Sequence, residues 1–355
     1  MQTWTSYPDL QISLPYQPDY EVELINTLSQ AADNIGIGLD RTVIANLYVS
    51  LKSKPLALLV GPKLTGKIAV IHWLAKILTE SDSDRFQIMA GHPWSFEKSE
   101  NIALIADAQT RLNTENLLTI IERAWHPENA HHIYMACITR ISPAEMLSFF
   151  TEISLQILNG QIHQLGDVHF ERPIPFPPNL FVIGTMDTAA FELWDSDLLS
   201  ETSVIQLSGD CNVSPVIENS ISSINEREFL GSRIRAKQAA FYRLHSIVRR
   251  VRQPLKPLLM VDTLLKAHGV ALSDSAVEGA IVYLANSWSR LGNGLFALDI
   301  SENLATALDL VFSQILLPRI FDSLWHLPDL CARLRDLFAE QFPRSYAFVT
   351  VTGQK

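Results

Sequence analysis

The chain has 355 residues, of which 47% are hydrophobic and 19% are charged, and its formal net charge is −10. This composition is typical of a globular protein, and the length exceeds the roughly 250 to 300 residues at which single cores stop growing, so we expect two domains. The negative charge argues against duplex DNA binding as the main role, because such binding depends on neutralising phosphates.

One basic stretch stands out in this acidic chain, from Arg243 to Lys256 with Arg249, Arg250 and Arg252. Its spacing is that of a helix face, and we interpret it as a solvated or subunit-facing stripe.

Cysteine content and apolar runs indicate the compartment. Cys137, Cys211 and Cys331 lie far apart without metal-ligand spacing, which fits a reducing environment. The first residues include Asp9 and lack a basic start followed by an apolar core, and no apolar run approaches the roughly 18 residues of a membrane span. We therefore expect a cytoplasmic protein with no membrane partner.

The first elements lead into a buried strand. Residues 1–20 carry prolines and scattered aromatics and predict an extended arm. Apolar residues at helical spacing predict a helix over 21–34, and Asp40 predicts the N-cap of a second helix that ends near residue 51. The apolar run over 56–60 then predicts a strand.

A glycine-rich turn follows, made of Gly61, Pro62, Lys63, Leu64, Thr65, Gly66, Lys67 and Ile68. Gly61, Gly66 and Lys67 have the spacing of a phosphate-binding loop, in which backbone N–H groups converge on phosphate at a helix N-terminus. The next position of such loops is Ser or Thr, whose hydroxyl binds Mg²⁺, and Ile68 cannot replace it because Mg²⁺ requires oxygen ligands. The turn predicts a phosphate cradle without its metal ligand; a chance glycine-rich strand-to-helix turn is the alternative.

Further strands alternate with helices. We expect strands over 86–90, 133–137, 180–185 and 204–207, helices over 116–124 and 142–158, and a hairpin over 161–170. Strands that are apolar throughout and alternate with helices predict a parallel sheet covered on both faces. Ligands of such sheets bind at the carboxyl ends of the strands. We therefore expect Lys67, Ala136, Cys137 and Asp187 to meet around one crevice.

A polar stretch separates this α/β part from a helical part. Residues 208–232 are rich in Ser and Asn and predict a linker. Helical patterns follow over 233–251, 258–268, 273–290, 301–318 and 327–341, and a last strand is expected over 347–351. We divide the chain into an N-terminal arm and helix (1–39), an α/β nucleotide-binding-type core (40–207), the linker (208–232) and a helical lid domain (233–355).

Several short segments resemble, in order, the McrB-like and MoxR-like branch of the AAA+ P-loop ATPases. They are residues 51–55, His92 to Trp94, Asn179 to Ala189, and residues 307–309 with 314–320. The resemblance covers roughly residues 40–320. It implies a P-loop AAA+ parallel sheet with flanking helices, followed by a smaller all-helical lid, and a nucleotide bound between neighbouring subunits.

The chain departs from that family at the positions that carry its chemistry. Where the family has an Asp-Glu pair that holds the metal's water shell and activates the attacking water, this chain has Ala136 and Cys137. Asp187 stands in place of the Asn that positions the water, and Glu201 in place of the arginine finger. A positioned base contributes about 10² to 10⁴ in rate and an arginine finger about 10³ to 10⁵. The resemblance therefore implies that this chain has the AAA+ architecture but lacks the catalytic groups of the family.

Other reactive residues have structural interpretations. Ala136 and Cys137 fit a small buried pair better than a nucleophilic site, because no His and acid are recognisably arranged to activate the thiol. His131 and His132 fit loop residues better than metal ligands. For Lys67 two roles remain open: it holds a phosphate, or it caps a helix or forms a salt bridge.

We expect a catalytically inactive McrB-like subunit that acts as an assembly or regulatory module. Its partners would be paralogous or identical AAA+ subunits in a ring-like assembly, with a nuclease or effector of a restriction or defence system. ATP or GTP would bind without a well-formed magnesium site, and direct nucleic-acid binding is not expected. Two alternatives are a slow ATP or GTP hydrolase completed by a partner subunit, and a nucleotide sensor without turnover.

Overall fold

The structure is a computed structural model that describes residues 19–34, 36, 38–62, 65–79, 84–90, 102–141, 162–165, 168–186, 202–207, 225–249 and 251–352. The arm expected before residue 19 and the helix expected over 142–158 lie outside these residues.

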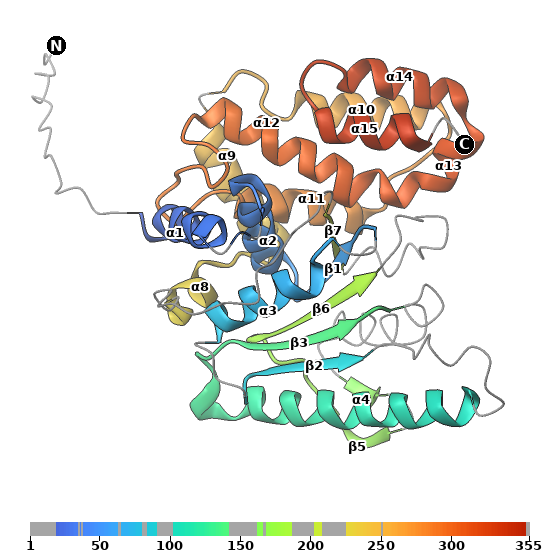
Figure 1. The fold of residues 1–355 in the computed structure, drawn as a ribbon. Helices are drawn as coiled ribbons and strands as arrows, with labels where there is room; N and C mark the ends of the chain where they lie inside the picture. The colour runs from blue at the N-terminus through green and yellow to red at the C-terminus, as the bar shows by residue number, and fades with distance from the viewer. Residues whose placement is uncertain are drawn as a thin grey trace, which may run out of the picture.

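A five-stranded parallel sheet forms the centre of the α/β part (Figure 1). Its strands are β1 (Leu56–Val60), β2 (Phe86–Ala90), β3 (Tyr134–Thr139), β6 (Leu180–Met186) and β7 (Thr202–Gln206), paired in the order β2-β3-β6-β1-β7. All the pairings are parallel, so the carboxyl ends lie at one edge of the sheet. β1, β3 and β6 are buried along their whole length. The expected parallel sheet is confirmed.

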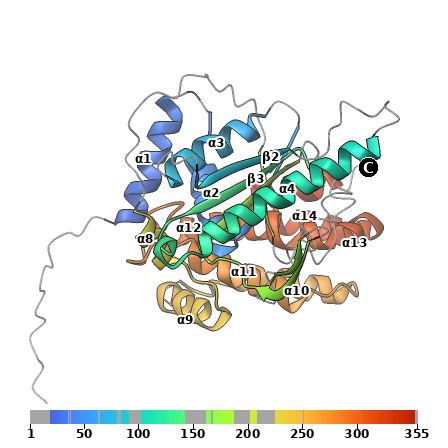
Figure 2. The same cartoon turned by 90° about the horizontal axis from the view of Figure 1, so that it is seen from below.

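Two helices cover this sheet. α3 (Lys67–Leu78) packs against β3 and β6, and α4 (Ile102–Trp125) packs against β2 and β3. Figure 2 shows them on different sides of β2 and β3. α4 is longer than the expected 116–124, because the preceding residues contain no glycine or proline and include several alanines, which favour helix. The predicted hairpin is confirmed as β4 (Ile162–Leu165) paired antiparallel with β5 (Val168–Ile174).

Two further helices precede the sheet. α1 (Tyr20–Asn34) packs on α2 (Arg41–Ser53), and α2 also contacts β1 and β7. Asp40 accepts a hydrogen bond from the Val43 N–H at 2.7 Å, which confirms the predicted N-cap.

The C-terminal part is helical, as expected. It contains α8 (Glu226–Ser232), α9 (Lys237–Val248), α10 (Lys256–Ala267), α11 (Asp274–Asn286), α12 (Ile300–Val311), α13 (Phe321–His326), α14 (Pro328–Phe338) and α15 (Pro343–Thr352). A π-helical turn, η5 (Phe312–Leu316), continues α12 and packs against β7. A 3₁₀ turn, η6 (Pro318–Ile320), follows. The helix expected over 301–318 is confirmed as far as Val311 and continues as the π-helical turn.

Two interpretations of the chain after β7, one of the linker and one of the basic stretch, are wrong. α8 lies inside the stretch expected to be linker, because Asn225 caps its first turn and Phe229 is fully buried. The basic stretch from Arg243 to Lys256 is not one helix face, because α9 ends at Val248 and α10 begins only at Lys256.

The strand expected over 347–351 is also wrong, because these residues belong to α15. The cap of this helix comes from a residue distant in sequence, the buried Asp309 on α12. Its carboxylate accepts hydrogen bonds from the Arg344 and Ser345 N–H groups at 3.0 and 2.9 Å, and from the Ser345 hydroxyl at 2.6 Å. The bonds to the backbone satisfy N–H groups in the first turn of α15, which have no acceptor within the helix.

One helical stretch in the described part of the chain, Ile300–His326, is long and apolar enough to cross a membrane by length and composition alone. Its most apolar window is 83% buried inside the protein. Because the protein itself covers this surface, we interpret the stretch as a core helix.

Candidate functional site

The glycine-rich turn begins where β1 leaves the middle of the sheet. The Val60 carbonyl accepts a hydrogen bond from the Leu207 N–H at 2.8 Å, which ties the end of β1 to the residue after β7. A Cβ atom at Gly61 would lie 2.3 Å from the Leu207 carbonyl oxygen. This first glycine is therefore required by the close approach of two backbones, whether or not a ligand binds.

The second glycine starts the helix. Gly66 has φ 71° and ψ 12°, a left-handed conformation that glycine adopts without steric cost, and it precedes the first residue of α3. No side chain caps this helix. The backbone N–H groups at the N-terminus of α3 and the dipole of this helix therefore favour a nearby anion.

Lys67 bends back over the turn that precedes it. The side chain is 4% exposed, and Nζ donates hydrogen bonds to the carbonyl oxygens of Gly61 (3.0 Å) and Pro62 (2.6 Å) and to Thr65 Oγ1 (3.0 Å). The Thr65 hydroxyl in turn donates to the Pro62 carbonyl at 3.0 Å. The three N–H groups of the ammonium are all donated to oxygen atoms of the turn itself, so the observed role of Lys67 is structural. A phosphate contact would have to replace one of these hydrogen bonds.

The turn brings together most of the predicted cradle but gives it no metal ligand of its own. Gly61, Pro62, Thr65, Gly66, Lys67 and Ile68 are described, whereas Lys63 and Leu64 lie outside the described residues. Ile68 is half-buried in the first turn of α3 and has no oxygen in its side chain to bind Mg²⁺. In the part of the chain that the structure describes, no three His, Cys, Asp or Glu side chains gather as a metal site.

The expected meeting of Ala136 and Cys137 with Lys67 is wrong. Ala136 pairs with Val182 and Cys137 with Ile183, and these two positions of β6 face Leu56 and Ala57 at the start of β1. Both residues are therefore buried inside the sheet, three and two positions before Thr139, the last residue of β3. Sequence reasoning placed them at the edge because it ended the strand at 137, whereas β3 continues to Thr139.

Burial also decides the chemistry of Cys137. Desolvation raises the pKa of its thiol to about 12, so the nucleophilic thiolate is not populated near neutral pH. The expectation of a small buried pair at this point is confirmed by the full burial of Ala136 and Cys137.

Three polar residues that sequence reasoning missed lie at the carboxyl ends of β3 and β6. The Arg140 N–H donates to Thr185 Oγ1 at 2.8 Å, and the Thr139 hydroxyl donates to the Met89 carbonyl at 3.3 Å. Arg140 has φ 56°, an uncommon left-handed conformation for a residue with a side chain, and is exposed. Among the described residues at this edge, cations and hydroxyls are present and carboxylates are not.

Two predicted site positions lie outside the described residues. Asp187 follows β6 and Glu201 precedes β7 in sequence. The same holds for the segment from His92 to Trp94 that resembles an AAA+ element. Their roles stay predictions.

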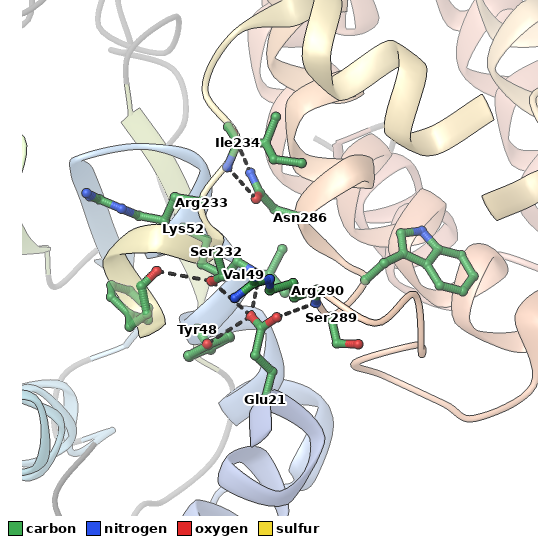
Figure 3. A network of polar contacts seen from close by, with 12 residues as sticks. Glu21, Tyr48, Val49, Lys52, Ser232, Arg233, Ile234, Asn286, Ser289 and Arg290 are labelled. Atoms are coloured by element: carbon green, nitrogen blue, oxygen red, sulfur yellow. Dashed lines mark hydrogen bonds and ion pairs between the residues drawn. The ribbon is translucent and has the colours of Figure 1, made fainter. Parts of the chain in front are cut away.

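A buried polar network joins the N-terminal helices to the helical region (Figure 3). The Glu21 carboxylate accepts hydrogen bonds from the Tyr48 hydroxyl (3.0 Å), Lys52 Nζ (2.5 Å), the Ser232 hydroxyl (3.2 Å) and the Arg290 N–H (2.6 Å). Burial lowers the pKa of Lys52 while the charge of Glu21 opposes that shift, and burial raises the pKa of Tyr48. The carboxylate is saturated with donors, so this network is structural.

A second buried ion pair lies near the two histidines. Arg85 donates to Glu226 at 2.5 Å, and the other oxygen of this carboxylate accepts from the Ile133 N–H at 2.6 Å. His132 Nδ1 lies 3.3 Å from the same oxygen, while His131 contacts the His132 ring. These contacts favour a structural role for His132 over metal binding.

The sheet, the turn and the helix that follows it define an α/β protein with a five-stranded parallel sheet, compatible with a P-loop-like fold. No protein-family model matches the chain, and no curated protein matches it either.

Proposed function

We propose that this chain is a P-loop-type subunit of McrB-like character that does not hydrolyse nucleotides and serves as an assembly or regulatory module in a cytoplasmic multi-subunit complex. The observation that carries the proposal is the chemistry of the carboxyl edge. There the described part of the chain supplies Lys67, Arg140 and the hydroxyls of Thr139 and Thr185, and Ile68 in the first turn of α3 has no oxygen to bind Mg²⁺.

Hydrolysis of a nucleoside triphosphate needs a group that orients or deprotonates water. A positioned base contributes about 10² to 10⁴ in rate, and neither the buried thiol of Cys137 nor the methyl group of Ala136 can act as one. Ile68 removes the hydroxyl that would bind Mg²⁺ beside the outer phosphates. With both functions missing, we expect turnover close to the uncatalysed rate.

Binding is a separate question from turnover. The N-terminus of α3 and Lys67 favour anions, and ATP or GTP would contact them without a protein ligand for Mg²⁺. We propose weak nucleotide binding that depends little on Mg²⁺, in a complex with identical or paralogous subunits and with a nuclease or effector as a further partner.

The test is titration of the full chain with a fluorescent ATP analogue and a fluorescent GTP analogue, with and without Mg²⁺. The variant is Lys67→Ala, and Lys76→Ala on the same helix is the matched control because Lys76 is exposed. We expect equal affinity with and without Mg²⁺ and at least about tenfold weaker binding for Lys67→Ala only. A thermal melt of each variant separates loss of the site from loss of the fold. Binding that requires Mg²⁺ would contradict the proposal.

A further inference from the structure

Two arginines converge on one backbone carbonyl beside the sheet. The Pro178 carbonyl oxygen accepts hydrogen bonds from Arg233 Nη1 at 2.7 Å and from Arg235 Nη2 at 3.4 Å. Arg233 also donates through Nε to the Leu230 carbonyl at 3.2 Å, so two carbonyl oxygens fix the orientation of its guanidinium. The two guanidinium groups therefore lie side by side at the Pro178 oxygen.

No carboxylate in the described part of the chain neutralises this pair. Burial lowers the pKa of both guanidiniums, the charge of Arg235 lowers that of Arg233 further, and no described carboxylate opposes these shifts. The sequence between residues 229 and 261 has eight Lys or Arg residues and no Asp or Glu. In Figure 3 the Arg233 side chain extends away from Glu21. Two like charges are thus held together without a counterion, which is unfavourable.

The surroundings offset this repulsion only for one of the two arginines. The Arg233 guanidinium carbon lies 5.3 Å from the centre of the Phe181 ring, whose face attracts a cation. Arg235 and Pro178 are exposed, so the pair is open to solvent. Among the described residues, Arg233 Nη2 and Arg235 Nη1 have no acceptor. Donors of both guanidiniums are therefore available to a ligand.

The helix that follows favours the same kind of ligand. α9 begins directly after Ala236, which provides no side-chain cap, and its first turn contains no acidic residue. The first residue of α9 is instead Lys237, which is exposed. A cation at a helix N-terminus opposes the helix dipole, whereas an anion there is stabilised. An anion at this junction would relieve both the helix start and the pair of arginines.

We propose that Arg233 and Arg235 bind the phosphate group of a small molecule. Guanidinium groups bind phosphate in a bidentate geometry. A phosphate dianion matches two positive charges, whereas a carboxylate neutralises only one. The net charge of −10 opposes the approach of a nucleic-acid backbone, which favours a compact ligand.

This site is separate from the glycine-rich turn. Pro178 precedes β6 and lies at the amino edge of the sheet, whereas Lys67 follows β1 at the carboxyl edge. The five residues of β1, at about 3.3 Å each, place these edges roughly 15 Å apart. The inference therefore goes beyond the proposed function and does not depend on nucleotide binding at Lys67.

The experiment is thermal unfolding of the full chain titrated with inorganic phosphate, pyrophosphate or AMP, each compared with sodium chloride at the same ionic strength. We expect phosphate at about 20 mM to raise the melting temperature by about 2 °C or more above chloride, because a ligand of the folded state stabilises it. Tighter binding of AMP than of inorganic phosphate would identify a nucleotide as the source of the phosphate, and equal binding would identify free phosphate.

The decisive variant is Arg235→Gln, because Arg235 is exposed and its loss leaves the packing of Arg233 on Phe181 in place. It should bind phosphate roughly tenfold or more weakly. Without phosphate it should melt at or above the wild-type temperature, since one of two repelling charges is gone. Arg227→Gln, which removes an exposed arginine on α8, is the matched control and should keep the full response.

Four results would overturn the inference. Phosphate may stabilise the wild type no more than chloride does, or Arg235→Gln may melt several degrees lower without phosphate, which would make the arginine structural. A full phosphate response in Arg235→Gln would place the anion elsewhere, and since Lys67 is intact in this variant, it would leave the proposed function untouched. Binding of a single-stranded oligonucleotide tighter than AMP, lost in Arg235→Gln, would make the pair a nucleic-acid contact.

Discussion

The Glu21–Lys52 ion pair is where we expect the largest effect of a single substitution on stability. The two side chains are 2% and 0% exposed and lie 2.5 Å apart. Glu21→Ala leaves the Lys52 ammonium buried without its carboxylate and removes the acceptor of Tyr48, Ser232 and the Arg290 N–H. Breaking a buried pair in this way costs about 3 to 5 kcal/mol in the free energy of unfolding.

Lys52→Met should cost less than Glu21→Ala, because the carboxylate keeps its other donors. The double variant Glu21→Gln with Lys52→Met removes both charges at similar volume, and such replacements are often close to neutral. We therefore expect it to be more stable than the sum of the effects of Glu21→Gln and Lys52→Met predicts. Glu21→Ala should also lose stability as pH falls from the ordinary pKa of a lysine, about 10.4, through the lowered folded pKa of Lys52. The pKa of Lys52 is already lowered by burial, so charging it in the folded state costs more once Glu21 is gone.

The measurement is equilibrium urea unfolding of the wild type, the single variants Glu21→Ala, Glu21→Gln and Lys52→Met, the double variant and Glu23→Gln. Glu23 lies two residues along the same helix and is exposed, so its substitution controls for loss of a carboxylate from α1. A Glu21→Ala variant within about 0.5 kcal/mol of the wild type would refute the reasoning. If the effects of Glu21→Gln and Lys52→Met on the free energy of unfolding simply add in the double variant, the proposed interaction between the two side chains is refuted.

Two further predictions concern the turn and the helical region. Gly61→Ala should destabilise the chain by about 1 to 3 kcal/mol in urea unfolding, because its Cβ would lie 2.3 Å from the Leu207 carbonyl oxygen; an unchanged midpoint would contradict this. The His268 hydrogen bond to Asp329 raises the pKa of His268 and lowers that of Asp329. Its contribution is full below the unfolded pKa of about 6.5 and is lost as pH rises through the raised pKa. The difference in melting temperature between wild type and His268→Gln should therefore be larger at pH 6 than at pH 9.

Local signals predicted much of the fold. Asp40 caps its helix and Leu165 pairs with Val168 in the hairpin expected over 161–170, because caps and hairpins depend on residues close in sequence. Apolar runs located all five strands of the parallel sheet, and β1, β3 and β6 are buried along their whole length, as expected for inner strands of a covered parallel sheet.

Distant contacts explain what the sequence could not predict. α15 contains β-branched and aromatic residues that favour a strand, and it is a helix whose cap, Asp309, lies 35 positions before Arg344. Lys52 and Glu21 sit on different helices, so no spacing rule pairs them. The same limit misplaced Ala136 and Cys137, because only the register of β3 against β6 shows how far they lie from the carboxyl edge.

The most direct test of the account is steady-state release of phosphate from ATP and from GTP by the purified full chain in the presence of Mg²⁺, compared with Lys67→Ala. The account predicts the same background rate for both proteins. Release by the wild type well above that background, abolished in a folded Lys67→Ala variant, would contradict it.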